Sequence, residues 1–208
     1  MVDLLNESGR NLLFLEARSH NAWLKKPVPD TLLRQLYELF KWGPTSANTG
    51  PARVVFLRTK AAKELLRPAL NPPNVDKTML APVTAIIGYD MKFYDKLPKL
   101  FPQAPMREYF ANNPPLIEST AQRNSSLQGG YFIVAARALG LDCGPMSGFD
   151  NHLVDKTFFA TAATAAGTPL FPGGDVRSNF LCNLGYGDRA QLFPRNPRLD
   201  FDEACALL

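Results

Sequence analysis

The sequence predicts an α+β protein, and three observations support this fold class. Short runs of β-branched and apolar residues predict strands at residues 53–59, 82–90 and 178–188. Apolar residues at helical spacing predict helices, of which the clearest lie at residues 29–42 and 116–139. These elements follow one another without the strict alternation of a βαβ sheet, which disfavours a parallel α/β fold.

The composition is that of an ordinary globular protein of 208 residues, with 46% hydrophobic and 20% charged residues. A chain of this size can bury a substantial core without disulfides or metals. We find no repeat and no clear linker, so we expect one domain over residues 1–208. The net charge of +4 suits a small ligand that carries phosphate, but it is too weak and too scattered to predict a nucleic-acid partner.

The cysteines and histidines argue against a disulfide framework and against a metal site. Cys143, Cys182 and Cys205 are an odd number without CxxC spacing, and His20 and His152 are the only histidines. We therefore expect no metal, and buried, reduced thiols. The N-terminus lacks a signal-peptide pattern, and no apolar run approaches the ~20 residues that span a bilayer. These features predict a cytoplasmic protein with no membrane partner.

Two helices are expected before the first strand. Residues 11–19 predict a short helix. The helix at 29–42 is better defined, with Asp30 as its expected N-cap. Its apolar face consists of Leu32, Leu33, Leu36, Leu39 and Phe40.

The strand at residues 53–59 leads into a helix at 61–70, which Pro68 should end. The strand at 82–90 follows and reads as buried. Residues 91–115 are aromatic, basic and broken by prolines, so they fit either a lid or an insertion over a site.

The longest helix is expected at residues 116–139. Gly129 and Gly130 lie inside it, at a propensity cost of about 1 kcal/mol each, which is tolerable if another backbone packs closely there. Arg123 and Arg137 are expected to be solvated charges on this helix.

The last part of the chain mixes short elements with loops. Asp150 is expected to cap a short helix that runs through Phe159. Residues 161–175 are small and rich in Gly and Pro, which predicts a mobile surface loop before the strand at 178–188. Residues 200–208 predict a short amphipathic helix.

Two apparent motifs fail on their context. Gly185, Gly187 and Ala190 satisfy G-x-G-x-x-A, but prolines follow where a phosphate-binding helix would have to start. Ser147 in "GPMSGF" lies one position away from the serine of a G-x-S-x-G nucleophile elbow, and two histidines leave few candidates for its base. Neither a Rossmann protein nor a serine hydrolase is predicted.

The stretch "WGPTSANTGPARVVF" at residues 42–56 places many small hydrogen-bonding groups at one helix-to-strand junction. None of these groups titrates near neutral pH, and Pro44 and Pro51 stiffen the turn. Together with the arginines near the C-terminus, such groups fit a phosphorylated, planar redox cofactor such as FMN. The phosphate would take arginines and hydroxyls, and the ring would take a cation and neutral donors.

Four segments, in order, resemble the nitroreductase family of FMN-dependent NAD(P)H oxidoreductases. They are "ARSHNAW" (17–23), "GPTSANTGPARVVF" (43–56), "GLDCGPMSGF" (140–149) and "FPRNPRL" (193–199). The resemblance implies a central mixed or antiparallel sheet flanked by helices, in an intertwined homodimer with FMN at its interface. It also implies that hydride passes from NAD(P)H, through the flavin N5, to a small carbonyl or nitro substrate.

Longer stretches resemble one subgroup of this family, the malonic semialdehyde reductases of pyrimidine degradation. These stretches include "KWGPTSAN", "APVTAIIGYD" and "RNSSLQGGYFIVAARALGLDCGPMSGFD". The resemblance implies reduction of 3-oxopropanoate to 3-hydroxypropanoate. Three alternatives stay open: a broad nitroaromatic or quinone reductase, a flavin-consuming enzyme of the same fold, and a flavin carrier without activity.

The resemblance assigns the cofactor phosphate to Arg18 and Ser19, with Arg195 and Arg198 approaching from the tail. Asn21 stands where the wider family often has a basic residue near the ring. For Arg18 and Arg198, ordinary surface positions are the alternative.

Around the flavin ring, the resemblance assigns Asn74 and Lys77, with Lys77 as the cation at the N1–O2 edge. Ser147 and Gly148 would lie near N5. The alternatives are a helix start for Asn74 and Lys77, and a turn for Ser147.

The second subunit would contribute the turn at residues 44–48, through Pro44, Thr45, Ser46 and Asn48. The long helix with its glycine pair would build the dimer interface. No residue stands out as the proton donor, although Tyr94 is a candidate. Lys99 and Arg107 are candidates for holding a substrate carboxylate.

Overall fold

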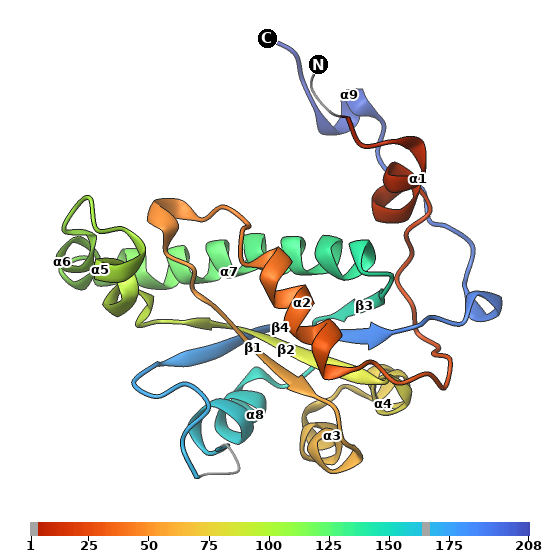
Figure 1. The fold of residues 1–208 in the computed structure, drawn as a ribbon, viewed down its shortest axis with the longest axis horizontal. Coiled ribbons are helices and arrows are strands. Elements are labelled where there is room, and N and C mark those ends of the chain that lie inside the picture. Colours follow the sequence, from red (N-terminus) through yellow and green to blue (C-terminus); the bar gives the residue numbers. More distant parts are fainter. Residues whose placement is uncertain (1–3, 164–166) are drawn as a thin grey trace.

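The computed structural model describes residues 4–163 and 167–208, and a four-stranded antiparallel sheet lies at its centre. The sheet has the order β1-β2-β4-β3 and antiparallel pairing throughout. Its strands are β1 (Ala52–Leu57), β2 (Val83–Asp90), β3 (Asp142–Met146) and β4 (Val176–Gly185). Helices cover both faces of the sheet (Figure 1), and the predicted α+β class is confirmed.

The two faces of the sheet carry different helices. The first face carries α2 (Asp30–Phe40) and α7 (Pro114–Ala138), and the second carries α3 (Lys60–Leu66), α4 (Pro72–Leu80) and α8 (Asn151–Val154). Because side chains alternate along a strand, β2 serves both cores. Ala85 and Ile87 pack with α2 and α7, whereas Ile86 packs on the opposite side.

Three of the four strands lie within a few residues of their predicted positions. The fourth, β3, was not predicted, because its sequence DCGPM contains Gly144 and Pro145, which read as a loop. Proline has no backbone N–H to donate, and it is tolerated in a strand at the edge of a sheet. Because β3 is an edge strand, Pro145 fits there.

The predicted helices α2, α3 and α7 are present, but two details were wrong. Asp30 is the first residue of α2 rather than its cap, and its carboxylate pairs with Arg58 at 2.6 Å. The N-terminal helix begins earlier than predicted, with α1 at Glu7–Arg10, and a helical turn continues it to Leu15. Residues 16–19 are not helical.

Helix α4 was not predicted, because Pro72 and Pro73 at its start resemble a helix breaker. Proline is well tolerated in the first turn of a helix, where its missing N–H would have no intrahelical partner. Helix α4 therefore forms directly after the prolines and leads, through a short connection, into β2.

Residues 91–115 form short helices around a small core of their own. These are α5 (Leu97–Leu100) and α6 (Met106–Ala111), preceded by a helical turn at Phe93–Lys96. Phe93, Leu97 and Phe110 are buried together, against Tyr89 of β2 and Ala121 of α7. The segment is thus packed against the sheet and α7.

The structure explains the glycine pair in α7 differently from the close backbone packing that the sequence suggested. A Cβ on Gly129 would lie 2.5 Å from the ring of Phe180, so a side chain rather than a second backbone requires glycine here. A Cβ on Gly130 would meet no atom within 4 Å among the described residues.

The C-terminal part agrees with most of the expectations. The Asp150 carboxylate accepts a hydrogen bond from the Leu153 N–H at 3.0 Å, so it caps α8 as predicted, and helical turns continue to Ala160. The predicted loop at 161–175 includes residues 164–166, which lie outside the described residues. The tail carries α9 (Phe201–Ala204) and extends away from the sheet, on the same side as α1 (Figure 1). Within the described ranges, no helix is long and apolar enough to cross a membrane.

Candidate functional site

The N-terminal segment with Arg18 and Ser19 lies along the free edge of β3. Ser19 forms an isolated parallel bridge with Cys143, and the His20 N–H donates to the Cys143 carbonyl at 2.9 Å. Trp23 then pairs with Gly187, just beyond β4. The backbone that carries the predicted phosphate-binding residues is therefore fixed on the sheet.

Helix α4 lies at the other end of the same edge and carries Asn74 and Lys77. The Asn74 amide donates to the Gly148 carbonyl at 2.8 Å. A Cβ on Gly148 would lie 2.6 Å from the Asn74 amide nitrogen, so only glycine fits this contact. The Trp23 indole N–H donates to the Lys77 carbonyl at 3.1 Å, which joins α4 to the N-terminal segment.

These contacts connect six of the predicted site residues along one edge of the sheet. They are Arg18, Ser19, Asn74, Lys77, Ser147 and Gly148. Asn21 lies in the same segment and is exposed. The side chain of Lys77 is half-buried, and burial lowers the pKa of its ammonium. No ion pair or hydrogen bond engages that ammonium among the described residues, so it is available to an anionic group.

Several arginines line a cleft of about 830 Å³ beside this edge. The Arg18 guanidinium donates to the Phe193 carbonyl at 2.5 Å, and the Arg195 guanidinium donates to the Ala17 carbonyl at 3.0 Å. The C-terminal tail is thus tied to the segment that carries Arg18 and Ser19. Arg189 also lines the cleft and was not predicted, because it lies in the failed glycine motif.

Two other arginines differ from expectation. Arg137 lines the same cleft and donates to the Leu13 carbonyl at 2.9 Å, so it is not the solvated helix charge that the sequence suggested. Arg198 is exposed and donates to the Asn196 and Pro197 carbonyls of its own tail. The structure does not bring Arg198 into the cleft.

His20 and Asp142 form a pair at the base of the cleft. The His20 Nε2 lies 3.4 Å from an Asp142 carboxylate oxygen, and the other oxygen accepts the Gly187 N–H at 2.8 Å. Burial lowers the pKa of His20, Asp142 opposes this effect, and Arg189 and Arg18 lower the pKa further. The neutral imidazole is therefore favoured.

The turn at residues 44–48 lies apart from this edge, over α7 (Figure 1). The Ser46 N–H donates to the Asn124 carboxamide oxygen at 2.8 Å, and the Asn48 amide donates to the Leu100 carbonyl at 2.8 Å. Ala47 and Asn48 adopt positive φ values of 48° and 49°, which residues other than glycine rarely adopt. The turn thus has a defined, strained shape, although Pro44, Ser46 and Asn48 are exposed.

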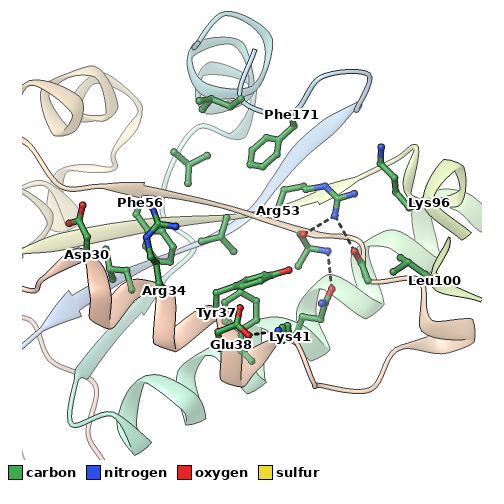
Figure 2. Close-up of a pocket in the computed structure, with 18 of the residues that line it drawn as sticks. Asp30, Arg34, Tyr37, Glu38, Lys41, Arg53, Phe56, Lys96, Leu100 and Phe171 are labelled. Atoms are coloured by element: carbon green, nitrogen blue, oxygen red, sulfur yellow. Dashed lines mark hydrogen bonds and ion pairs between the residues drawn. The ribbon is translucent and has the colours of Figure 1, made fainter. Parts of the chain in front are cut away.

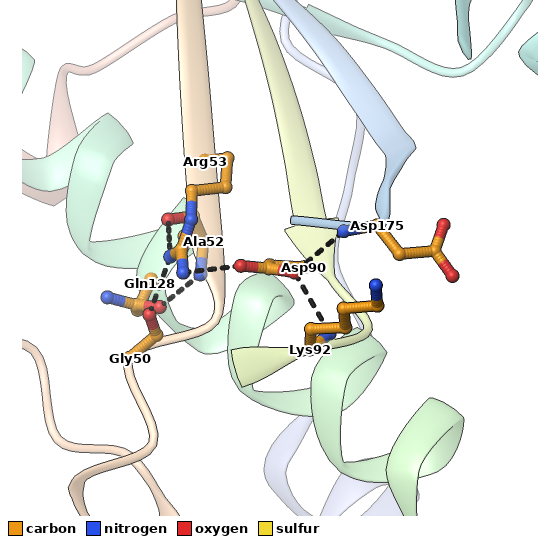
Figure 3. Close-up of polar contacts among 7 residues, drawn as sticks. All are labelled: Gly50, Ala52, Arg53, Asp90, Lys92, Gln128 and Asp175. Carbon is orange, nitrogen blue, oxygen red and sulfur yellow. Dashed lines mark hydrogen bonds and ion pairs between the residues drawn. The ribbon is translucent and has the colours of Figure 1, made fainter. Parts of the chain in front are cut away.

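A buried ion pair supports the end of this turn (Figure 3). The Arg53 guanidinium pairs with Asp90 at 2.7 Å and donates to the Gly50 carbonyl at 3.0 Å. The Asp90 carboxylate also accepts the N–H groups of Lys92 at 2.9 Å and Asp175 at 3.2 Å. One buried pair therefore joins the turn to the ends of β1 and β2 and to the segment that precedes β4.

A second cleft, of about 1120 Å³, lies between α2 and β1 (Figure 2). Tyr37, Phe56 and Phe171 supply aromatic surface, and Arg34, Lys96 and Lys99 line it without ion-pair partners among the described residues. It lies beside the outer edge of β1, which is an edge strand of the sheet.

The candidates for substrate contact do not lie together in one site. Lys99 lines the second cleft, but Arg107 is engaged by Asp95 at 3.0 Å. Tyr94 packs against the small core around Phe93. No cluster of three His, Cys, Asp or Glu side chains suited to a metal ion occurs in the described part of the chain. All three cysteines are free, and Cys205 is exposed, contrary to the expectation of buried thiols.

The fold and the edge site together define a class: an antiparallel α+β protein in which arginines, a hydroxyl and a lysine without a partner among the described residues come from segments beside one edge strand. Such a donor set suits a ligand that joins a phosphate to a polar ring. Residues 15–167 match the sequence profile described as the nitroreductase family, and the chain belongs to this family.

Individual relatives agree with this assignment. A Burkholderia lata protein, provisionally named NADH dehydrogenase/NAD(P)H nitroreductase, is 58% identical over 199 residues, which cover 96% of each chain. A provisionally named nitroreductase structure from Bacillus subtilis has a TM-score of 0.81 at 19% identity and covers 98% of this chain and 100% of its own. A similarly named Exiguobacterium sibiricum structure, in complex with FMN, has a TM-score of 0.80 at 17% identity and covers 100% of both chains. These two structures show the fold, and the predicted nitroreductase-like architecture is confirmed.

Proposed function

We propose that this protein is an FMN-dependent oxidoreductase that uses NAD(P)H. The observation that carries the proposal is the connected edge site, in which α4, with a lysine that has no partner among the described residues, and an arginine cleft lie beside the same strand, β3. Membership of the nitroreductase family and the FMN-bound structural relative support it. FMN would supply a hydride acceptor and donor at its N5.

The phosphate would be held by Arg18, Ser19 and Arg195, and Arg189 would add a further charge to the cleft. Guanidinium groups bind phosphate through short, charge-assisted hydrogen bonds. Arg18 and Arg195 already hold each other's backbone segments, so a phosphate would meet donors that are largely ordered. Arg198 belonged to the predicted set, but its contacts within the tail give it a weaker case.

The ring would lie over Ser147 and Gly148, beside Asn74 and Lys77. Lys77 would neutralise negative charge that accumulates on the ring, and no carboxylate of the described residues pairs with its half-buried ammonium, which suits that task. Asn21 is exposed in the neighbouring segment and would approach the same ligand.

Pro44, Thr45, Ser46 and Asn48 would serve the cofactor of a second copy in an intertwined homodimer. Their turn is held by hydrogen bonds to α7 and α5 and is largely exposed, yet it lies away from the site of its own chain. The C-terminal tail of each copy could pack on the other copy, because its apolar Phe201 and Leu207 are exposed. The outer edge of β1 and the cleft beside it would receive such a tail.

Two substrate classes are proposed, in order. The first is malonic semialdehyde, reduced to 3-hydroxypropanoate, which rests on the subgroup resemblance in the sequence. The second is a range of nitroaromatic compounds or quinones, which the name of the Burkholderia lata relative favours. Lys99 would be the candidate for a substrate carboxylate, since Arg107 already pairs with Asp95.

The test begins with the visible spectrum of the purified protein, with and without added FMN. We expect an oxidised-flavin spectrum and NAD(P)H oxidation with parallel double-reciprocal lines, because two substrates use one face in turn. Turnover of malonic semialdehyde and of a nitrofuran, with NADH and with NADPH, would rank the substrates. Absence of flavin binding after FMN addition would refute the proposal.

A further inference from the structure

Side chains from three other parts of the chain hold the C-terminal end of α4. The last four carbonyls of any α-helix lack intrahelical partners. Here the Lys77 carbonyl accepts from Trp23 at 3.1 Å and from Asn183 at 3.3 Å. The Lys63 ammonium donates to the carbonyls of Thr78 at 3.3 Å and Met79 at 2.9 Å, and it also binds the Ala81 carbonyl.

Lys63 is an unusual residue for this position. It is only 6% exposed, and burial alone lowers the pKa of its ammonium. No carboxylate of the described residues pairs with it, so backbone carbonyls are its partners. An apolar residue of similar size would avoid the desolvation cost of a buried charge. The charged ammonium instead donates hydrogen bonds to three carbonyls at the end of one helix.

Asn183 completes this support from beneath. It is fully buried on β4, and its amide nitrogen also lies 3.3 Å from the Thr78 hydroxyl. Its carboxamide oxygen accepts from the Thr84 hydroxyl of β2 at 2.7 Å. A buried polar network with all its partners present specifies a single arrangement of the elements it joins.

The supported turn is the one that carries Lys77. Asn74 and Lys77 are three residues apart and so lie on the same face of α4. The amide of Asn74 is fixed on Gly148, and the backbone of Lys77 is fixed by Trp23 and Asn183. Only the side-chain torsions of Lys77 remain free, and its ammonium has no partner among the described residues.

We propose that Lys63 and Asn183 are positioning residues that act through Lys77. They hold the last turn of α4 so that the Lys77 ammonium faces the anionic edge of the bound flavin ring. This inference rests on the proposed function, because it takes Lys77 as a cofactor contact.

The experiment compares Lys63→Met, Lys77→Met and the double variant, with Lys60→Met as the matched control. Lys60 is the exposed first residue of the same helix, α3, and carries the same charge. The readouts are the dissociation constant of FMN, from fluorescence quenching, and the midpoint potential of the bound flavin. Thermal unfolding shows which variants fold.

We expect Lys77→Met to weaken FMN binding about tenfold, as for loss of one charge-assisted hydrogen bond, and to lower the midpoint potential. Lys63→Met should move both quantities in the same direction by a smaller amount. The double variant should equal Lys77→Met alone, because a positioning effect disappears with the residue that it positions. Lys60→Met should change neither quantity.

Asn183→Leu, of similar volume, provides a second route if Lys63→Met fails to fold. In FMN-free protein, an amine-reactive reagent labels Lys77 at a measurable rate. This rate should change in both Lys63→Met and Asn183→Leu. If Lys77→Met alters FMN binding but Lys63→Met and Asn183→Leu do not, the positioning role is refuted and the proposed function stands. Additive effects of Lys63→Met and Lys77→Met would also refute it. If wild-type protein binds no FMN, the proposed function fails, and an unchanged labelling rate refutes the positioning role separately.

Discussion

His20 shows how one buried residue links the fold to the arginine cleft. It is 2% exposed, and a Cβ on Gly187 would lie 1.9 Å from its Nδ1, so ring and glycine fill one space. The groups that face it are Asp142, Arg189, Arg18 and Asp188. Desolvation dominates over the attraction of Asp142, so the folded protein holds His20 neutral.

A pH dependence follows from the lowered pKa of His20. The unfolded chain binds a proton near the ordinary value of 6.5, whereas the folded chain binds it only at lower pH. The stability due to neutral His20 is therefore present above that value and is lost as pH falls through the folded pKa. The unfolding free energies of FMN-free wild type and His20→Gln should thus converge between about pH 8 and about pH 5. A difference that grows on acidification would contradict this assignment.

At the residue scale, the sequence predicted the site residues that lie in its motifs. It missed the residues that only folding places close to them. Arg18 and Arg195 lie in recognisable segments, and the structure places them in one cleft. Arg189 and Lys63 carry no local signal. Arg189 lies in a glycine motif that suggested another fold, and nothing in the sequence of α3 shows that Lys63 is buried. Long-range packing decides both.

At the element scale, two Arg–Asp pairs at the two ends of β1 allow a matched test. Arg53 and Asp90 are 18% and 3% exposed, whereas Arg58 and Asp30 are 47% and 55% exposed. We expect Arg53→Met to lower the free energy of unfolding by about 3–5 kcal/mol, because it leaves a buried carboxylate without its partner. Arg58→Met should cost about 0–1 kcal/mol. Urea unfolding of both variants measures the difference.

The double variant Arg53→Met with Asp90→Asn should recover part of the loss, because no unpaired charge then remains buried. The turn at 44–50 should also lose its fixed end, since Arg53 holds the Gly50 carbonyl. Faster proteolysis within this turn in Arg53→Met than in Arg58→Met would report that loss. Equal stability of the two single variants would show that the buried pair does not fasten the turn.

The sequence predicted elements well where periodicity was strong, as in α2, α7 and β2. It missed β3 and α4, and both contain prolines that read as loop residues. Tertiary position explains each case: Pro145 lies in an edge strand, and Pro72 and Pro73 lie in the first turn of a helix. These two elements carry Ser147, Gly148, Asn74 and Lys77 or lie directly beside them, so the architecture of the site came only from the structure.

At the scale of the whole molecule, one chain supplies two separate parts of the proposed site. The segments beside β3 carry the arginines and Lys77, whereas the strained turn at 44–48 lies over α7 (Figure 1). Strain of this kind persists where the surrounding structure holds it in place, and it is often found at functional sites. In the proposed dimer, the turn of one copy would lie at the β3 edge of the other copy. The strained conformation would then serve the cofactor site of that partner.

The C-terminal tail is the part of the chain best suited to join two copies. After α9 the backbone is extended at Cys205, and Leu207 is 88% exposed. Asp202 and Glu203 carry negative charge, and the cleft beside β1 offers Arg34, Lys96 and Lys99. An extended segment can add to the free edge of β1 by main-chain hydrogen bonds, while its leucines cover the aromatic surface of the cleft.

If two copies join as proposed, removal of residues 200–208 should convert the proposed dimer to monomer and weaken FMN binding, although Arg18 and Arg195 are intact. Sedimentation measures the first effect and fluorescence quenching the second. The control is Asp202→Asn with Glu203→Gln, which keeps the apolar tail and removes two charges; we expect a dimer whose dissociation constant rises with salt less steeply than that of wild type. A truncated protein that stays dimeric and binds FMN as tightly as wild type would show that the tail does not join the copies. A truncated monomer that still binds FMN tightly would show instead that the turn at 44–48 does not complete the partner's site.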